Sequence, residues 1–176
     1  MSIQAHGFAG PRRSGVEILT AGFTLIEMMT VIALFAIMLA LALPSFNGLI
    51  ERYRVGARIG ALEASLSVAR MEAIRRGKNV QLMPEAGCGS AGDQAWTCGW
   101  TVQAGTKLLR REQPDVRLIV SATVDVFEFN AYGNLTPWGN ILVYPRGNAQ
   151  SSNAIRLCIG IGGQMRRQSG PGPCVT

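Results

Sequence analysis

The segment Gly22-Phe23-Thr24-Leu25-Ile26-Glu27 opens an apolar run from Thr24 to Leu43, in which Glu27 is the only charged residue. This run is long enough to cross a bilayer as a helix. Arg12 and Arg13 precede it, and such a positive flank predicts a cytoplasmic N-terminus and an exported C-terminal part. A cleavable secretory signal would have a shorter apolar core followed by a small-residue cleavage site. Judged by membrane topology alone, an ordinary uncleaved signal anchor explains this segment as well as a more specialised membrane helix does.

The sequence after the apolar run predicts that the helix continues. Pro44 follows the run directly, and a proline in a helical pattern kinks or ends a helix. Beyond it, apolar residues recur at steps of three and four positions, which predicts an amphipathic helix to about Arg76, with Gly77 as its stop. The stripe consists of Phe46, Ile50, Tyr53, Ala57, Ala61, Ala64, Val68 and Met71. We expect it to be mainly the core contact of its own domain, with binding of partner helices as the alternative.

From Asn79 on, short β-like runs alternate with Gly, Pro and Asn. The candidate strands are 79–83, 97–103, 116–122, 124–130, 140–144 and 154–161. The fold class expected is α+β: a long N-terminal helix, transmembrane in its first half, whose amphipathic second half packs on a small antiparallel sheet. The predicted parts are a leader (1–22), a transmembrane helix half (23–43), an amphipathic helix half (44–77) and a globular β region (78–176).

The segment from Gly22 to Glu27, placed at the start of an apolar helix, resembles the processing site of type IV prepilins and type II secretion pseudopilins. The resemblance implies that a prepilin peptidase cuts after Gly22, where glycine leaves the backbone unhindered, and methylates the amine of Phe23. It also implies that Glu27 faces the N-terminal amine of a neighbouring subunit, and that the helix can loosen at Pro44. A charge inside a membrane helix costs about 2.5–3.5 kcal/mol. The alternative for Glu27 is an interfacial glutamate solvated by head groups.

The downstream sequence resembles the GspH/FimT branch of this family. Trp96–Val102 resembles its tryptophan-containing strand, Phe127–Gly133 its strand and turn, and 155–167 its last strand and glycine-arginine turn. We expect Trp96 and Trp100 to pack in the core rather than form a ligand platform. The leader is longer than most in this branch, which a start codon assigned too far upstream would explain.

This resemblance implies the pilin fold and a minor pilin or minor pseudopilin at or near the tip of a type IV pilus or type II secretion pseudopilus. Its partners would be the prepilin peptidase, other pilins or pseudopilins, and the inner membrane. The chain would span that membrane once, with its C-terminal domain in the periplasm, before assembly into the filament. The sequence does not decide between the two machines.

Four cysteines follow the apolar run: Cys88, Cys98, Cys158 and Cys174. An even number in an exported domain favours disulfides. The economical pairing joins Cys88 to Cys98 and Cys158 to Cys174, since each bond closes a local loop, but the spacing leaves the other two pairings open. CxxC spacing and a nearby histidine are both missing, so no zinc site is expected.

The sequence ends in a basic segment, because no acidic residue follows Glu128. Phosphate backbones attract such surfaces without sequence specificity. Some FimT-type pilins of competent bacteria bind DNA through a Gly-Arg-x-Arg motif in this tail, and the matching stretch here runs from Gly163 to Arg166. Gln164 replaces the first arginine, and Arg167 is a candidate to compensate for it. The alternative function is therefore a FimT-like, DNA-binding minor pilin for natural transformation; the alternative for the turn is a solvated or subunit-contacting segment.

The alternative from another class is a membrane-anchored periplasmic enzyme, and the sequence does not favour it. The only histidine, His6, lies in the leader, so the mature chain lacks Ser-His-Asp and Cys-His arrangements. Asp125 and Glu128 lie three positions apart on a predicted strand, and they should point to opposite faces. A glycine-rich phosphate loop of the GK[ST] type does not occur in the sequence. We expect no cofactor and no metal.

Overall fold

The computed structural model describes residues 22–85 and 95–174, without the side chains of residues 41–45. The chain forms two compact units, residues 1–42 and 43–176. Helix α1 (Leu25–Arg76) does not end at Pro44, which lies inside it. No helix within the described residues has both the length and the apolarity to span a membrane. The transmembrane assignment of 23–43 stays a prediction from the sequence.

The C-terminal end of α1 confirms the predicted stop at Gly77. Gly77 has a φ of 61°, a left-handed conformation that glycine adopts without strain. Its N–H donates to the carbonyl of Ile74 (3.3 Å), and the N–H of Lys78 donates to the carbonyl of Ala73 (3.3 Å). These two bonds make a Schellman motif, which satisfies carbonyls that the helix end would otherwise leave free.

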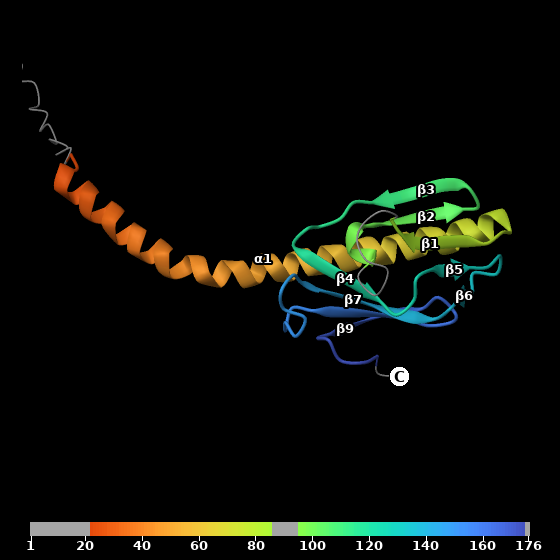
Figure 1. Ribbon diagram of the computed structural model, residues 1–176. Helices are drawn as coiled ribbons and strands as arrows, with labels where there is room; N and C mark the ends of the chain where they lie inside the picture. Colours follow the sequence, from red (N-terminus) through yellow and green to blue (C-terminus); the bar gives the residue numbers. More distant parts are fainter. Residues whose placement is uncertain (1–21, 86–94, 175–176) are drawn as a thin grey trace, which may run out of the picture. The chain divides into compact units, whose positions relative to one another are not determined.

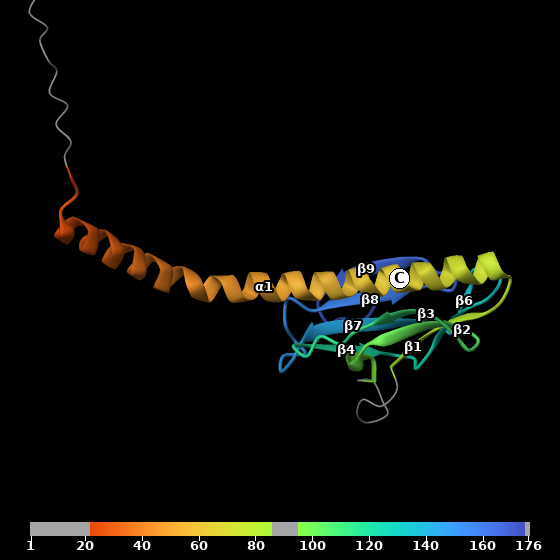
Figure 2. The same cartoon turned by 90° about the horizontal axis from the view of Figure 1, so that it is seen from above.

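Nine strands and one 3-10 helix follow in the described part of the chain. They are β1 (Val80–Pro84), η1 (Ala95–Cys98), β2 (Trp100–Ala104), β3 (Lys107–Glu112), β4 (Leu118–Ala122), β5 (Phe127–Phe129), β6 (Leu135–Thr136), β7 (Gly139–Pro145), β8 (Ile155–Ile159) and β9 (Met165–Ser169). They form two antiparallel sheets, ordered β3-β2-β1-β5-β6 and β4-β7-β8-β9. Figures 1 and 2 show the second half of α1 lying against both sheets. The predicted α+β class is confirmed.

Three strands were not among those predicted, and each is short or polar. β3 and β9 are edge strands with the sequences KLLRRE and MRRQS, and β6 has two residues. Charged edge strands are common because they block pairing with other chains, but they lack the apolar alternation that identifies a strand. The predicted strand 97–103 starts only at Trp100, since Gly99 turns the chain with a φ of 97° and a side chain there would meet the carbonyl of Glu112.

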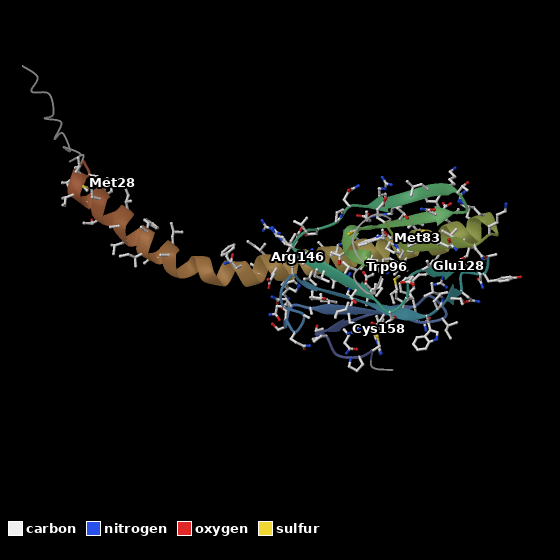
Figure 3. The ribbon with its side chains drawn as sticks, viewed as in Figure 1. Met28, Met83, Trp96, Glu128, Arg146 and Cys158 are labelled. Carbon is white, nitrogen blue, oxygen red and sulfur yellow. A yellow bond between two sulfur atoms is a disulfide. The ribbon has the colours of Figure 1, made fainter. Side chains whose placement is uncertain are left out.

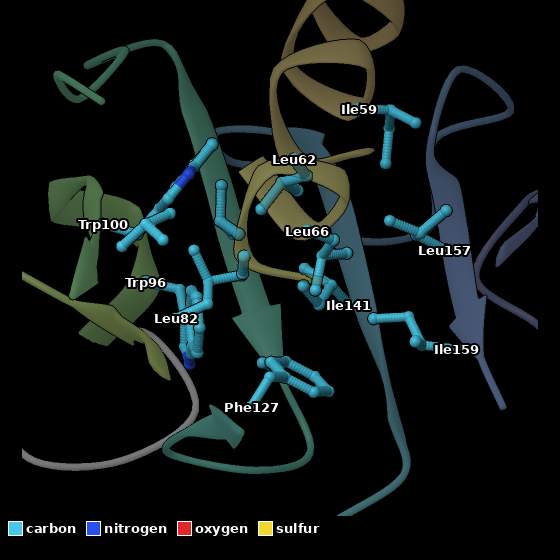
Figure 4. Packing of buried hydrophobic residues seen from close by; sticks show 14 of the residues in the cluster. Ile59, Leu62, Leu66, Leu82, Trp96, Trp100, Phe127, Ile141, Leu157 and Ile159 are labelled. Carbon is cyan, nitrogen blue, oxygen red and sulfur yellow. The ribbon is translucent and has the colours of Figure 1, made fainter. Parts of the chain in front are cut away.

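The core lies between the helix and the two sheets. One face of α1 contributes six buried residues: Val55, Ile59, Leu62, Leu66, Ala69 and Ala73. Figure 4 shows Leu62 and Leu66 between Trp96, Trp100 and Leu82 of one sheet region and Ile141, Leu157 and Ile159 of the other. Trp96 and Trp100 are fully buried, as expected. Their indole N–H groups donate to the carbonyl of Val124 (3.1 Å) and to Oγ of Ser65 (2.9 Å), respectively.

The apolar stripe predicted as the core contact lies mostly on the opposite side of α1, so that prediction was wrong except for Ala61, which packs against the core. Two positions along a helix correspond to a rotation of about 200°. Four stripe residues stand two positions before a buried core residue and therefore face away from the core: Tyr53, Ala57, Ala64 and Met71. Tyr53 is 76% exposed and Met71 60% exposed. The helix has two apolar faces, and the fold buries the one that carries Val, Ile and Leu in its central turns. The other face, from Phe46 to Met71, is called the outer stripe below.

Candidate functional site

Gly22 and Phe23 lie immediately before α1, outside any helix or strand, and both are exposed. No atom lies within 4 Å of the position that a side chain at Gly22 would occupy. The peptide bond predicted to be cut is therefore accessible in the described part of the chain.

Thr24 fixes the start of α1, a role that the sequence analysis missed. Its Oγ1 accepts a hydrogen bond from the backbone N–H of Glu27 (3.2 Å), as an N-cap residue does. The sequence did contain a signal for this helix start, because Thr24 and Glu27 have the Thr-x-x-Glu spacing of a capping box. The cap places Glu27 in the first helical turn, where its negative charge is favourable.

The carboxylate of Glu27 is exposed and forms no ion pair with the residues that the structure describes. The side chains around it are almost entirely apolar, and every described side chain from 22 to 40 is exposed. Figure 3 shows Met28 on this segment. Phe23, Leu25, Ile26, Met28, Met29, Ile32, Leu34, Phe35, Ile37, Met38 and Leu39 are each at least half exposed. This half of the helix offers a continuous apolar surface with one charge. Pro44 lies within α1.

In the globular unit, the outer stripe also exposes apolar side chains. Phe46 is 57% exposed and Ile50 44% exposed. Beside the stripe, Gly56 and Gly60 lie one helical turn apart, and no atom lies within 4 Å of the position of an added Cβ at either glycine. Small residues spaced by four positions let another helix approach the backbone closely. Within the described residues, the space beside both glycines is open.

The glycine-arginine turn connects β8 to β9. Gly163 has a φ of 73° and its backbone is covered by Phe129 and by the Arg70 side chain, which a Cβ would approach at 3.1 and 3.3 Å. Glycine is therefore required at this position by conformation and space. The side chain of Gln164 folds back over Gly160, whose added Cβ would lie 2.5 Å from Nε2 of Gln164.

Arg166 and Arg167 point to opposite faces of β9. Arg166 lines a pocket of about 420 Å³ together with Gln164 and the exposed Trp138. Arg167 instead donates to both carboxylate oxygens of Glu63 on α1. The structure thus brings Gln164 and Arg166 together and separates Arg167 from them, so Arg167 does not replace the charge missing at Gln164.

A disulfide joins Cys158 on β8 to Cys174 with a Cα–Cα distance of 5.9 Å, as predicted. Figure 3 labels Cys158 on the second sheet. Cys98 is also disulfide-bonded. Its predicted partner, Cys88, lies outside the described residues, so the pairing of these two stays a prediction.

Comparison with known protein families gives two matches. Residues 59–170 match the family described as type II transport protein GspH, and residues 20–43 match the prokaryotic N-terminal methylation motif. No curated protein is similar enough in sequence to count as a match. The first match covers more than half of the chain and spans the core face of α1 and both sheets.

Two solved structures are similar to this chain. The type IV minor pilin FimU of Pseudomonas aeruginosa strain PAO1 has 20% sequence identity and a TM-score of 0.52, over 67% of this chain and 90% of that one. The minor pseudopilin EpsH from the type 2 secretion system of Vibrio cholerae has 13% identity and a TM-score of 0.49, over 68% of this chain and 98% of that one. At such identities the likeness to FimU shows a shared fold.

Proposed function

Since this chain belongs to the GspH family of minor pilins and pseudopilins and carries the N-terminal methylation motif, we propose that it is cut between Gly22 and Phe23, methylated at Phe23 and assembled by its long helix into a filament. The filament is a type IV pilus or a type II secretion pseudopilus, and the subunit sits at or near its tip. The family consists of structural subunits rather than enzymes.

One observation carries this proposal: the helix exposes apolar side chains in both units of the chain. Residues 23–40 expose theirs throughout, and the outer stripe does the same on the face opposite the core. Large exposed apolar patches mark interaction sites. The occupant we propose is the N-terminal helix of neighbouring pilin-like subunits, since a helix fits the narrow stripe and the small residues at Gly56 and Gly60 permit close approach.

Before assembly, we propose that residues 23–43 lie in the bacterial inner membrane, with the C-terminal domain in the periplasm. The apolar run has the length for this role, and Arg12 and Arg13 give the orientation. The prepilin peptidase reaches the exposed Gly22–Phe23 bond just before the helix begins. Loosening of the helix at Pro44 is part of this proposal, because proline removes one backbone hydrogen bond there.

Glu27 has the assembly role in this proposal. Its carboxylate forms no ion pair with described residues, and a lone charge among apolar side chains is unfavourable in a membrane. The methylated amine at Phe23 of a neighbouring subunit supplies the positive partner. Such a pair selects one axial register between helices, because an offset of one turn leaves both charges unpaired.

The test uses the full chain in a strain with an active prepilin peptidase. Mass spectrometry of membrane protein should show a chain beginning at N-methylated Phe23. Gly22→Val should block cleavage through crowding at the scissile bond, whereas Gly22→Ala should interfere less. An uncut chain beginning at Met1 in the wild type overturns the proposal.

Assembly is measured separately in sheared filaments. Glu27→Val should leave membrane insertion intact, since the inserted helix loses its charge, but it should reduce incorporation into filaments. Glu27→Asp keeps the charge and serves as the matched control. Normal incorporation of Glu27→Val would remove the assembly role of this residue while leaving the processing step in place.

A further inference from the structure

We propose that a pocket at the start of the globular unit binds the phosphate head group of an anionic phospholipid. The inference rests on the membrane anchoring proposed above. The pocket has a volume of about 490 Å³ and lies between α1 and the adjoining ends of β4 and β7. Figure 3 labels Arg146, one of its lining residues, beside the helix at this end of the unit.

Three arginines give the pocket its charge: Arg54 of α1, Arg117 before β4, and Arg146 after β7. Arg146 is held in place, because its Nε donates to the carbonyl of Val116 (2.7 Å) and its backbone N–H to the carbonyl of Arg117 (2.8 Å). Within the described residues, the side chains of Arg54 and Arg117 form no ion pair. Two guanidinium groups therefore remain available for an anion.

Glu51 and Asp115 lie near these arginines and, as carboxylates, offset part of this charge. Glu51 lines the pocket, and its Oε2 already accepts a hydrogen bond from Nδ2 of Asn153 (3.1 Å). Asp115 accepts a hydrogen bond from the backbone N–H of Arg117 (3.0 Å). Three arginines against one glutamate leave the lining of the pocket with a net positive charge. A phosphate is the complementary ligand group.

The pocket is also apolar, which favours a lipid over a free anion or a nucleic acid. Ile50 and Val116 line it, and Val116 is 75% exposed. Phe46 and Leu49, outside the lining on the preceding turn of α1, are 57% and 61% exposed. A ligand that combines a phosphate with a hydrocarbon chain matches both parts of this surface.

Counted along the helix, the pocket begins within the head-group distance of the predicted membrane span at Asn47, and Arg54 lies beyond it. Asn47 and Arg54 lie four and eleven residues beyond Leu43, which corresponds to about 6 and 16 Å along a helix. Head groups occupy roughly 5–8 Å on each side of the hydrocarbon core. Side chains on a helix point toward its N-terminus, so the long side chain of Arg54 reaches back toward that layer. A bound lipid would hold the base of the domain at the membrane until the subunit leaves it.

The experiment titrates the full mature chain, in a neutral detergent, with phosphatidylglycerol or phosphatidylcholine and follows binding by native mass spectrometry. The double variant Arg54→Gln/Arg117→Gln should bind phosphatidylglycerol about 30-fold more weakly, from about 1 kcal/mol for each arginine near a membrane surface. The matched control Lys78→Gln/Lys107→Gln removes the same charge from two exposed lysines outside the pocket and should bind like the wild type. Arg54→Lys/Arg117→Lys should restore most of the affinity.

Several results would overturn the proposal. One is that the protein binds phosphatidylglycerol and phosphatidylcholine with equal affinity, and another is that the lysine control variant loses as much affinity as the arginine variant. The others are that inorganic phosphate binds as tightly as the lipid, or that duplex DNA displaces the lipid from the same arginines. The N-terminal mass and filament incorporation are measured on the same preparations. Processed, assembled protein that shows no lipid preference defeats this inference alone, whereas an unprocessed chain defeats the proposed function.

Discussion

Arg167 of β9 is bound to Glu63 of α1, with its Nε 2.6 Å from Oε1 and its Nη2 hydrogen-bonded to Oε2. The hydrogen bonds and the negative charge raise the pKa of Arg167, because the carboxylate stabilises the charged guanidinium. The two charges compensate each other on the helix side of the second sheet. Arg166, one residue earlier, has no such partner among the described residues and lines the pocket beside Trp138.

This geometry predicts that any DNA binding by the C-terminal turn depends on Arg166 and not on Arg167. Arg166→Gln should lower the affinity for duplex DNA and reduce the salt slope by about one unit, since one phosphate contact is lost. Gln164→Arg should raise the affinity because it adds a charge on the face of Arg166. Fluorescence anisotropy at low and moderate salt measures both effects. Arg167→Gln is the control, and an equal loss in that variant would contradict the assignment.

A large side chain at Gly60 should block assembly without harming the fold. Gly60→Leu fills space that no described atom occupies, and replacing a helical glycine should raise the free energy of unfolding by up to about 1 kcal/mol. Incorporation into sheared filaments should fall, because the neighbouring helix can no longer approach. Gly60→Ala gives a similar gain in stability with little added bulk and should assemble nearly normally. Wild-type incorporation of the leucine variant would show that this face is not an interface.

Loss of the Cys158–Cys174 bond should destabilise the second sheet. The cysteines are separated by 16 positions, and closing a loop of that size stabilises a protein by about 3 kcal/mol in the chain-entropy model. Cys174→Ser should lower the free energy of unfolding by about that amount, as followed by denaturant titration. Reductant should have less effect on this variant than on the wild type. Peptide mapping without reductant should also find the Cys88–Cys98 pair, and a scrambled map would refute the predicted pairing.

Acid should weaken the end of α1 through Glu72. Hydrogen bonds from Arg75 and Arg76 lower the pKa of Glu72 to about 2. A carboxyl whose pKa is lower in the folded state stabilises the fold above its unfolded pKa, near 4.5, and that contribution disappears as the pH falls toward 2. Thermal unfolding between pH 2 and 6 should show a shallower pH dependence in Glu72→Gln. The difference should shrink in high salt, which screens exposed ion pairs.

The sequence predicted the features that depend on local chemistry. The end of α1 at Gly77 needs a left-handed residue, and the strands rich in Val, Ile and Leu have the right alternation. The pairing of Cys158 with Cys174 was predicted as the one that closes a local loop, although the spacing left other pairings open, and the structure confirms it.

The sequence did not predict which face of α1 is buried or that β9 forms, because both depend on tertiary contacts. A period of three and four residues fits both faces of α1, so periodicity alone could not select the face that is buried. The buried face carries the larger aliphatic side chains Ile59, Leu62 and Leu66. On the same face, Ser65 accepts a hydrogen bond from the indole N–H of Trp100. The polar strand β9 is likewise ordered by its neighbour β8 rather than by its own pattern.

The core face of α1 has a consequence for the order of folding. Glu63 bonds to Arg167 and Glu51 to Asn153, across 104 and 102 positions of chain. One wall of the core is made early in synthesis, while the β8–β9 hairpin that closes it is made last. Ile59, which faces Leu157 of β8, therefore stays uncovered on that side until the hairpin forms. Contacts between such distant positions slow folding, because a long loop must close before the contact forms.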